Sequence, residues 1–327
     1  MENMEFLYII IGFILLIKAS DYFVEASTLI AKIFGVSEII IGATIVSIGT
    51  TLPETMVSAT SAVRGYGDIA YGNALGSIIC NTSLISAISL IFAPRKLDKK
   101  DLKIPVIFFF SSFSLYMVFA YFFNEFSRIA GIILVSIFII YVLFIINNSK
   151  SNSANADKND TIQNNQNDKF HQILKSTLII IISAAIIAFA SNLLVENGTL
   201  IAKKFKVPES VIGITMLALG TSLPEFSTAI TALVKGYNNL SLGNIIGANF
   251  FNVVLVTGIA STLGPFKIPT SKIVNGINSS LLVEVPVALT VMLVLCLPSM
   301  LFSKTKRWQG IVLLGIYCLF LYYQFKL

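Results

Sequence analysis

The stretch GATIVSIGTTLPETMVSAT, from Gly42 to Thr60, returns in pattern as GITMLALGTSLPEFSTAIT, from Gly213 to Thr231. The two copies begin 171 positions apart, since 42 plus 171 is 213. Both are long apolar runs interrupted at the same place by Gly-Thr-Thr/Ser-Leu-Pro-Glu. A polar signature that returns at a fixed distance indicates an internal duplication, in which each copy is one structural unit.

A second motif follows in each copy at the same spacing. GNALGSIICN ends at Asn81 and GNIIGANFFN ends at Asn252, and these two residues are again 171 positions apart. Each copy also places one carboxylate inside an apolar run, Glu54 in the first and Glu225 in the second. Duplicated polar motifs in apolar segments indicate a transporter built from two repeats around one central site.

The composition places the chain in a lipid bilayer. It is 55% hydrophobic and 12% charged, with a mean hydropathy of +0.83, whereas soluble domains carry about 25% charged residues. The start, MENMEF, has no basic residue, so the first apolar run is interpreted as a retained span and not a cleaved signal. Cys80, Cys296 and Cys318 show no pairing or metal-ligand spacing, and the single His171 excludes histidine-rich metal chemistry. The formal charge of +6 lies mainly in loops, so it does not indicate nucleic-acid binding.

We expect an all-α membrane protein with ten transmembrane helices, because a span needs about 20 mostly apolar residues. The candidate spans are 6–31, 37–63, 69–93, 104–123, 128–147, 173–201, 208–234, 240–263, 280–302 and 308–325. Residues 1–147 form the first five-helix repeat and residues 171–327 the second. Residues 148–170 are rich in Asn, Ser, Asp and Lys and are expected to be a disordered cytoplasmic linker. Because five is odd, the second repeat enters from the opposite face, so the repeats are inverted.

Loop charges orient this layout. The face that holds the N-terminus collects eight Lys and Arg residues, and the opposite face collects fourteen. Cytoplasmic loops carry an excess of Lys and Arg, so the second face is expected to be cytoplasmic and both termini extracellular, in the plasma membrane.

The Gly-Thr-Thr/Ser-Leu-Pro-Glu motif predicts a broken helix in each repeat. Proline lacks an N–H and clashes with the preceding turn, so helix breaks are expected at Pro53 and Pro224, with Gly49 and Gly220 easing the opened backbone. Unwound backbone is tolerated inside a membrane where it lines a cavity or a site. The motif gathers carbonyl, hydroxyl and carboxylate oxygens, which hard cations such as Ca²⁺ and Na⁺ prefer. The hydroxyls and carboxylates in question belong to Thr50, Thr51, Glu54, Thr221, Ser222 and Glu225.

The second motif combines packing glycines with polar side chains. Ser77 and Asn81 share a helix face because they are four positions apart, and Ala248 and Asn252 do so in the other copy. Asn81 and Asn252 are divided evenly between an ion-ligand and a structural interpretation. The remaining residues receive structural interpretations: close helix packing for Gly72, Gly76, Gly243 and Gly247, and interhelical hydrogen bonds for Asn73 and Asn244.

Together the two motif pairs resemble the repeats of the calcium/cation antiporter superfamily, specifically sodium/calcium exchangers and their prokaryotic homologues. The resemblance implies two inverted halves around sites for one Ca²⁺ and several Na⁺ ions, with alternating access, no cofactor and no enzymatic activity. By motif position it implies Glu54 and Glu225 as shared central ligands. It implies flanking and outer oxygens from Thr50, Thr51, Thr221, Ser222, Ser77, Asn81 and Asn252, and backbone carbonyls from Ser47 and Ala218.

Two positions depart from some prokaryotic homologues. Ala248 supplies no side-chain oxygen where those proteins have serine, and Asn252 is uncharged where they have aspartate. The close alternative is a proton-coupled Ca²⁺/cation exchanger of the same fold. A passive cation channel and an intramembrane protease with two carboxylates are the alternatives from other classes. The duplication places both carboxylates in one chain, so we expect the chain to function singly in the bilayer.

Overall fold

The structure is a computed structural model that describes residues 4–156, 166–205, 220–269, 273–274 and 277–326. It is a helical bundle in which short π-helical turns, labelled η, interrupt several long helices. From Met4 to Ala156 the elements are α1 (Met4–Phe34), α2 (Glu38–Ile41), η1 (Gly42–Val46), α3 (Ser47–Val63), α4 (Gly67–Cys80), η2 (Asn81–Ile85), α5 (Ser86–Phe92), α6 (Lys99–Val118), η3 (Phe119–Phe123), β1 (Glu125–Phe126) and α7 (Arg128–Ala156). From Gln166 to Lys326 they are α8 (Gln166–Lys204), α10 (Leu223–Val234), α11 (Asn238–Phe251), η4 (Asn252–Val256), α12 (Thr257–Leu263), β2 (Phe266–Lys267), β3 (Ile273–Val274), β4 (Ile277–Asn278), η5 (Ser280–Glu284), α13 (Val285–Phe302) and α14 (Arg307–Lys326).

Within the described residues, eight helical segments are long and apolar enough to cross a membrane. They coincide with the predicted spans one to six, eight and nine. The seventh predicted span, 208–234, lies partly outside the described residues, and α10 covers its second part. The tenth coincides with α14, which is not among the eight. Helices α7 and α8 extend into the predicted linker from both ends, and residues 157–165 lie outside the described part of the chain.

The expected helix break at Pro53 is wrong. Helix α3 runs through Pro53 without interruption, although the proline leaves the Gly49 carbonyl without its usual i+4 donor. Packing supports the helix here, because a Cβ on Gly49 would lie 2.9 Å from the ring of Phe23 in α1. The irregularity lies upstream instead, in η1. In the second repeat the chain does turn at Ser222, and α10 starts with Pro224 in its first turn, as expected.

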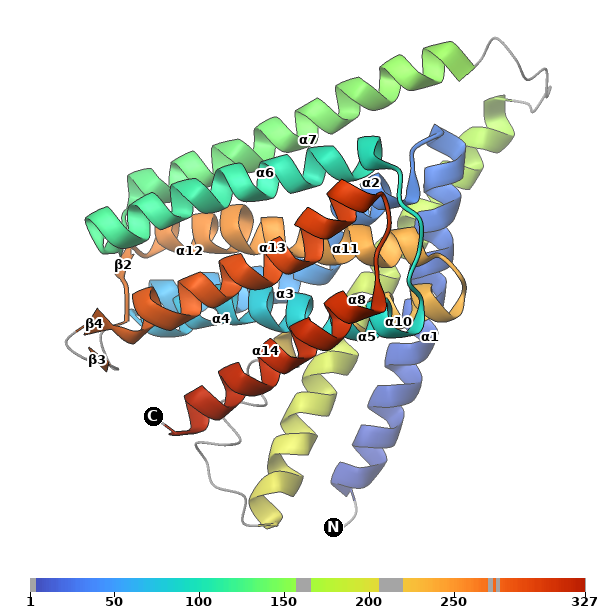
Figure 1. Cartoon of the computed structure of the whole chain (residues 1–327). Helices are drawn as coiled ribbons and strands as arrows, with labels where there is room; N and C mark the ends of the chain where they lie inside the picture. Colours follow the sequence, from blue (N-terminus) through green and yellow to red (C-terminus); the bar gives the residue numbers. More distant parts are fainter. Residues whose placement is uncertain (1–3, 157–165, 206–219, 270–272, 275–276, 327) are drawn as a thin grey trace.

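Helices α1 and α8, the first of each repeat, run side by side at a steep inclination to most of the other helices (Figure 1). They form their own apolar cluster, which includes Phe23, Val24, Ile187 and Leu194. A larger cluster fills the space between α4, α6, α11 and α13. The molecule therefore consists of a two-helix unit packed against a core that carries the motif helices.

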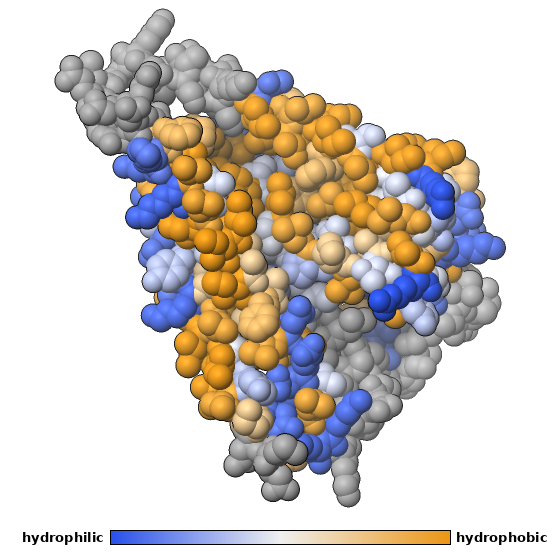
Figure 2. Space-filling model, turned by 180° about the vertical axis from the view of Figure 1, so that it is seen from behind, coloured by the Kyte–Doolittle hydropathy of each residue, from blue (hydrophilic) through white to orange (hydrophobic). Residues whose placement is uncertain are grey.

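The outer surface is apolar over a broad area, with hydrophilic residues gathered in patches (Figure 2). Exposed side chains on the long helices include Ile10, Ile14, Ile140 and Ile181, each more than half exposed. Such a surface would be unfavourable in water, and it fits a bilayer. The chain is therefore an integral, multi-pass membrane protein.

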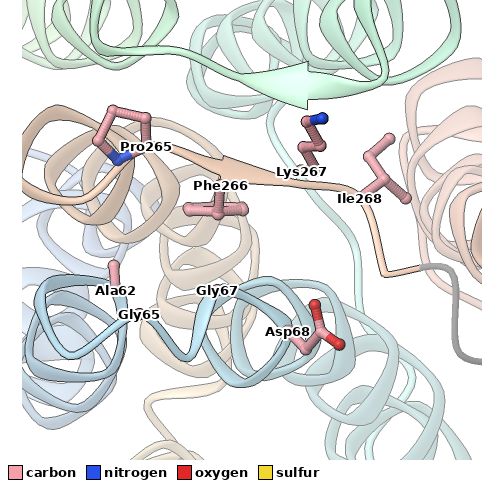
Figure 3. Close-up of a pocket in the computed structure, with 8 residues that line it drawn as sticks. All are labelled: Ala62, Gly65, Gly67, Asp68, Pro265, Phe266, Lys267 and Ile268. Atoms are coloured by element: carbon pink, nitrogen blue, oxygen red, sulfur yellow. The ribbon is translucent and has the colours of Figure 1, made fainter.

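A short antiparallel ladder closes one end of the bundle. Strand β1 pairs with β2, with Glu125 opposite Lys267 and Phe126 opposite Phe266. Figure 3 shows that Phe266 points from β2 towards α4, whereas Lys267 projects from the other side of the strand towards β1. Gly67 allows this approach, because a Cβ there would collide with Phe266. A second hairpin, β3–β4, lies at the same end (Figure 1).

Candidate ion-binding site

The two motif glutamates are fully enclosed in the protein. Glu54 on α3 and Glu225 on α10 are both 0% exposed. Their carboxyl groups are close enough to interact electrostatically with each other. Within the described part of the chain, neither oxygen of Glu54 has a hydrogen-bond partner, and neither does Oε2 of Glu225. A buried carboxylate without a partner is unfavourable by several kcal/mol, so both groups require a cation or a proton.

Hydroxyl groups from the first repeat face the glutamate of the second. Thr51 Oγ1 donates a hydrogen bond of 3.3 Å to Glu225 Oε1. Thr50 also interacts with Glu225, and its Oγ1 lies 3.3 Å from Asn244 Oδ1. Both threonines are buried. The two copies of the motif therefore meet in one place, as a single shared site requires.

The asparagines that end the second motif begin π-helical turns. Asn81 is the first residue of η2 and Asn252 the first residue of η4, so the irregularity is duplicated at the same spacing as the motif. Both side chains are 0% exposed, and among the described residues neither their Nδ2 nor their Oδ1 atoms have hydrogen-bond partners. Turn η2 packs against α10 and turn η4 against α3. Each asparagine thus lies on an element that contacts the glutamate helix of the other repeat.

Two further hydroxyls on the motif segments are also unsatisfied. Ser77 Oγ and Ser222 Oγ are buried and lack a hydrogen-bond partner in the described structure. Buried polar atoms are otherwise nearly always paired, and so many exceptions on one set of helices need an explanation. Two carboxylates with neutral hydroxyl and amide oxygens balance the charge of one divalent cation and suit hard ions. Among the residues described, no group of three or more His, Cys, Asp or Glu side chains offers another metal site.

The remaining predicted ligands are placed differently. Ser47 is buried, and its hydroxyl donates to the carbonyls of Gly42 at 2.6 Å and Asn244 at 3.0 Å. Its own carbonyl, the atom predicted as a ligand, lies 3.4 Å from Thr50 Oγ1. Thr221 is half-buried and directly precedes the turn at Ser222. Ala218 lies outside the described residues.

The structural interpretation of Asn73 and Asn244 agrees with their contacts. Asn73 Nδ2 donates to Ser58 Oγ at 2.9 Å and to the Glu54 carbonyl at 3.2 Å. Asn244 Nδ2 donates to Thr228 Oγ1 at 3.0 Å. Each asparagine therefore joins the second motif helix to the glutamate helix of its own repeat.

The packing interpretation of the glycines is confirmed for the second repeat. A Cβ on Gly243 would collide with the backbone of Ile39, and one on Gly247 with Ala43 and Ser47. Gly72 and Gly76 have no atom within 4 Å of a Cβ in the described structure. The positions equivalent to Ile39 and Ala43, 210 and 214, lie outside the described residues.

One polar cluster beside the site was missed from the sequence. Asn249 Nδ2 donates to Thr82 Oγ1 at 2.6 Å and lies 3.1 Å from Met292 Sδ. Both polar residues are buried: Thr82 lies within η2, and Asn249 lies near the end of α11, just before η4. A signal was available: position 78, which corresponds to Asn249, is Ile78, so a polar residue appears in only one copy of an otherwise duplicated segment.

Comparison with known proteins identifies the family of this chain. The model of the family described as "Sodium/calcium exchanger protein" matches residues 4–147 and 175–326, nearly the whole chain. The chain belongs to the sodium/calcium exchanger family. This is a family of membrane transporters and not of enzymes, as expected from the motifs.

Curated relatives extend over nearly the same length. The sodium/calcium exchanger MaX1 of Methanosarcina acetivorans is 33% identical, with 98% of both chains covered. An uncharacterized membrane protein of Methanocaldococcus jannaschii is 33% identical, covering 95% of this chain and 94% of its own. The inner membrane protein YrbG of Escherichia coli is 32% identical, with 86% of both chains covered.

Solved structures of the sodium–calcium exchanger NCX_Mj share the architecture. The structure soaked with 10 mM Na⁺ and zero Ca²⁺ superposes with a TM-score of 0.79 at 30% identity, covering 98% of both chains. The structure soaked with 2.5 mM Na⁺ and 1 mM Sr²⁺ gives a TM-score of 0.80, with the same identity and coverage. This exchanger and our chain therefore have the same fold along almost their entire lengths.

Proposed function

We propose that the protein is a secondary active antiporter that exchanges Na⁺ for Ca²⁺ by alternating access. The observation that carries this proposal is the meeting of Glu54 and Glu225, one from each copy of the repeat, in an enclosed region of unsatisfied oxygens. Family membership supports it, as do the names of MaX1 and NCX_Mj.

The proposed ligands follow from this geometry. Glu54 and Glu225 neutralise one Ca²⁺, and Thr50, Thr51, Ser77, Asn81, Thr221, Ser222 and Asn252 supply neutral oxygens, with the carbonyls of Ser47 and Ala218. When Na⁺ ions occupy the region instead, the same two carboxylates balance their charge. Because the carboxylates are unfavourable when unneutralised, the empty site resists conformational change, and this couples the movement of one ion to the return of the other.

We further propose ten spans in two inverted repeats, with both termini extracellular in the plasma membrane and a single chain as the functional unit. The charge excess in the loops supports this orientation. A C-terminal reporter that is active only in the cytoplasm tests it, and an active reporter would reverse the orientation.

Calcium uptake by proteoliposomes under separately imposed gradients tests the coupling ion. A sodium gradient alone should drive ⁴⁵Ca²⁺ uptake, and a proton gradient alone should not. Uptake driven only by protons would replace sodium coupling with the proton-coupled alternative. Flux without any counter-ion would indicate a channel.

A further inference from the structure

The end of the bundle opposite β1–β2 carries a second antiparallel ladder. The α5–α6 loop meets the α13–α14 loop, where Lys96 lies directly opposite Lys304. Leu97 N donates to Ser303 O at 2.9 Å and Thr305 N donates to Arg95 O at 2.8 Å. This pattern makes the two lysines a non-hydrogen-bonded pair, the arrangement in which side chains come closest, with Cβ atoms about 5 Å apart.

The two ladders are counterparts in the duplication. Lys96 corresponds to Lys267 at the constant spacing of 171 positions. Leu97 N and Ile268 N donate to the residue before the facing position, Ser303 and Asn124, and both of those residues have φ of 52°. Lys304 therefore takes the place in its ladder that Glu125 takes in the other, although these two residues are 179 and not 171 positions apart. At one end of the bundle Lys267 faces a glutamate, and at the other Lys96 faces a second lysine.

Like charges directly opposite each other destabilise a ladder unless an anion lies between them. In the described structure neither lysine has an acidic side chain within salt-bridge distance. Residues 95–103 hold five basic and two acidic side chains, and residues 304–307 hold three basic ones. One of those acids, Asp98, accepts a hydrogen bond from Lys100 N at 2.9 Å. We call these two segments, 95–103 and 304–307, the basic loop pair.

Arg95 adds positive charge beneath this pair. Its guanidinium donates a hydrogen bond from Nη2 to Ser89 Oγ at 3.1 Å. Its Nε and Nη1 atoms are buried and have no partner among the described residues. Burial lowers the pKa of Arg95 to about 10, and the nearby charge of Glu38 acts in the opposite direction. Arg95 therefore contributes electrostatic potential to the surface above it without needing direct contact with a bound anion.

The surroundings are those of a membrane interface. Four membrane helices end or begin here, and their exposed apolar side chains are Phe92, Leu301, Phe302 and Trp308. Trp308 is the only tryptophan in the chain, and tryptophan is enriched at the headgroup level of membranes. Lys306 Nζ lies 4.0 Å from the centroid of the Phe302 ring, so basic and apolar groups are in direct contact.

We propose that the basic loop pair binds the headgroup of an anionic phospholipid, whose phosphate lies between Lys96 and Lys304 while its acyl chains cover Phe302 and Leu301. A soluble anion would satisfy the lysines but would leave these apolar side chains uncovered. The orientation proposed above places this site at the cytoplasmic leaflet, which carries anionic lipids.

Lipid retention by the full-length protein tests the site. The delipidated protein is reconstituted in nanodiscs of phosphatidylcholine with or without phosphatidylglycerol, and bound lipid is measured by native mass spectrometry after release into detergent. Wild type should retain phosphatidylglycerol in preference to phosphatidylcholine. Losing one lysine, in Lys304→Gln, should weaken retention roughly fivefold, and the double variant Lys96→Gln/Lys304→Gln roughly 25-fold.

Two further variants use the duplication as a control. Lys304→Glu recreates the Glu125–Lys267 pairing, so it should abolish retention while raising the melting temperature of the lipid-free protein. Lys267→Gln removes the counterpart lysine at the other end and should leave retention unchanged. The site would be overturned if Lys267→Gln lost as much bound phosphatidylglycerol as Lys304→Gln, or if the wild-type protein retained phosphatidylglycerol no better than phosphatidylcholine. If inorganic phosphate raised the melting temperature of the protein in phosphatidylcholine nanodiscs as much as phosphatidylglycerol does, the ligand would be a free anion and not a lipid. None of these measurements requires ion transport, so the result is independent of the coupling ion.

Discussion

The two copies of the repeat are alike in sequence but occupy different states in the folded protein. Thr51 of the first copy donates a hydrogen bond to Glu225 of the second copy. The reciprocal bond, from Ser222 to Glu54, is not formed: in the described structure the Ser222 hydroxyl and both carboxylate oxygens of Glu54 have no hydrogen-bond partner. The alternating access proposed above requires such an asymmetry, because the two faces of the membrane must not be open together.

The same asymmetry appears where the two-helix unit meets the core. Lys235, after α10, bonds to Glu25 Oε1 at 2.6 Å and to Asp21 Oδ1 at 3.4 Å on α1. The counterparts of Lys235 and Glu25, 171 positions away, are Arg64 after α3 and Glu196 on α8, and both are exposed without an ion pair in the described part of the chain. The counterpart of Asp21 is the uncharged Asn192. The ion pair between the end of α10 and α1 is therefore formed, whereas the described structure has no ion pair between Arg64 and Glu196.

The largest expected effect comes from removing either central charge. Glu54→Gln or Glu225→Gln should abolish ⁴⁵Ca²⁺ uptake by proteoliposomes, because losing one partner of a buried charge assembly costs about 3–5 kcal/mol, or at least 100-fold in ion affinity. Glu284→Gln is the control and should be mild, since Glu284 accepts a hydrogen bond of 3.1 Å from Gln324 away from the motifs. If one glutamine variant alone retained uptake, the two glutamates would not be equivalent ligands.

The next largest effect concerns the packing of the second motif, which differs between Gly247 and its counterpart Gly76. Gly247→Ala should lower the stability by about 1–3 kcal/mol, because its Cβ would collide with Ala43 and Ser47. Gly76→Ala should be mild, because a Cβ there meets no described atom within 4 Å. Thermal unfolding in detergent measures both. Equal destabilisation by the two substitutions would contradict the difference in packing between Gly247 and Gly76.

A third carboxylate tests the proposed role of the asparagines. Asn252→Asp should make Ca²⁺ uptake more sensitive to protons, by about one pH unit or 1.4 kcal/mol, because the added group must lose its proton before it can bind an ion. Uptake is measured across a pH series, with Asn81→Asp as the counterpart in the first repeat. An unchanged ion and pH profile in both variants would remove the asparagines from the ligand set.

The smallest effect concerns the Lys235 ion pair and its counterpart Arg64. Lys235→Gln removes the link between α10 and α1 and should change the ratio of exchange rates under sodium gradients of opposite direction. The change should correspond to about 0.2–1 kcal/mol, since the pair is partly exposed. Arg64→Gln should leave this ratio unchanged, because Arg64 is exposed and has no ion pair in the described part of the chain. Equal shifts in the two variants would mean that this ion pair does not distinguish the two copies.

The duplication accounts for what could be predicted from the sequence. The repeated motifs located both buried glutamates, and the position of Asn73 and Asn244 beside a glycine favoured the hydrogen bonds that the structure shows. Apolar length located eight spans. These features depend on local pattern, which a single chain displays directly.

Features that depend on neighbouring helices could not be predicted. Pro53 stays within a continuous helix because α1 packs against Gly49, and that contact comes from a helix about 25 residues earlier. The π-helical turns at Asn81 and Asn252 leave no mark in the hydrophobic period, because each is one extra residue absorbed by surrounding packing. The Lys96–Lys304 pair joins loops more than 200 positions apart.

The π-helical turns mark two short windows where the chain holds one residue more than a regular α-helix would. Deleting one residue between Thr82 and Ile85 would let η2 relax into a regular α-helix. Because the wide turn absorbs that extra residue, α5 would keep about the same rotation relative to Ser77, and its face towards α14 would be preserved. The wide turn that begins at Asn81 would be lost. A deletion in the regular part of α4 has no such turn to absorb it and would rotate everything after it by about 100° around the helix axis.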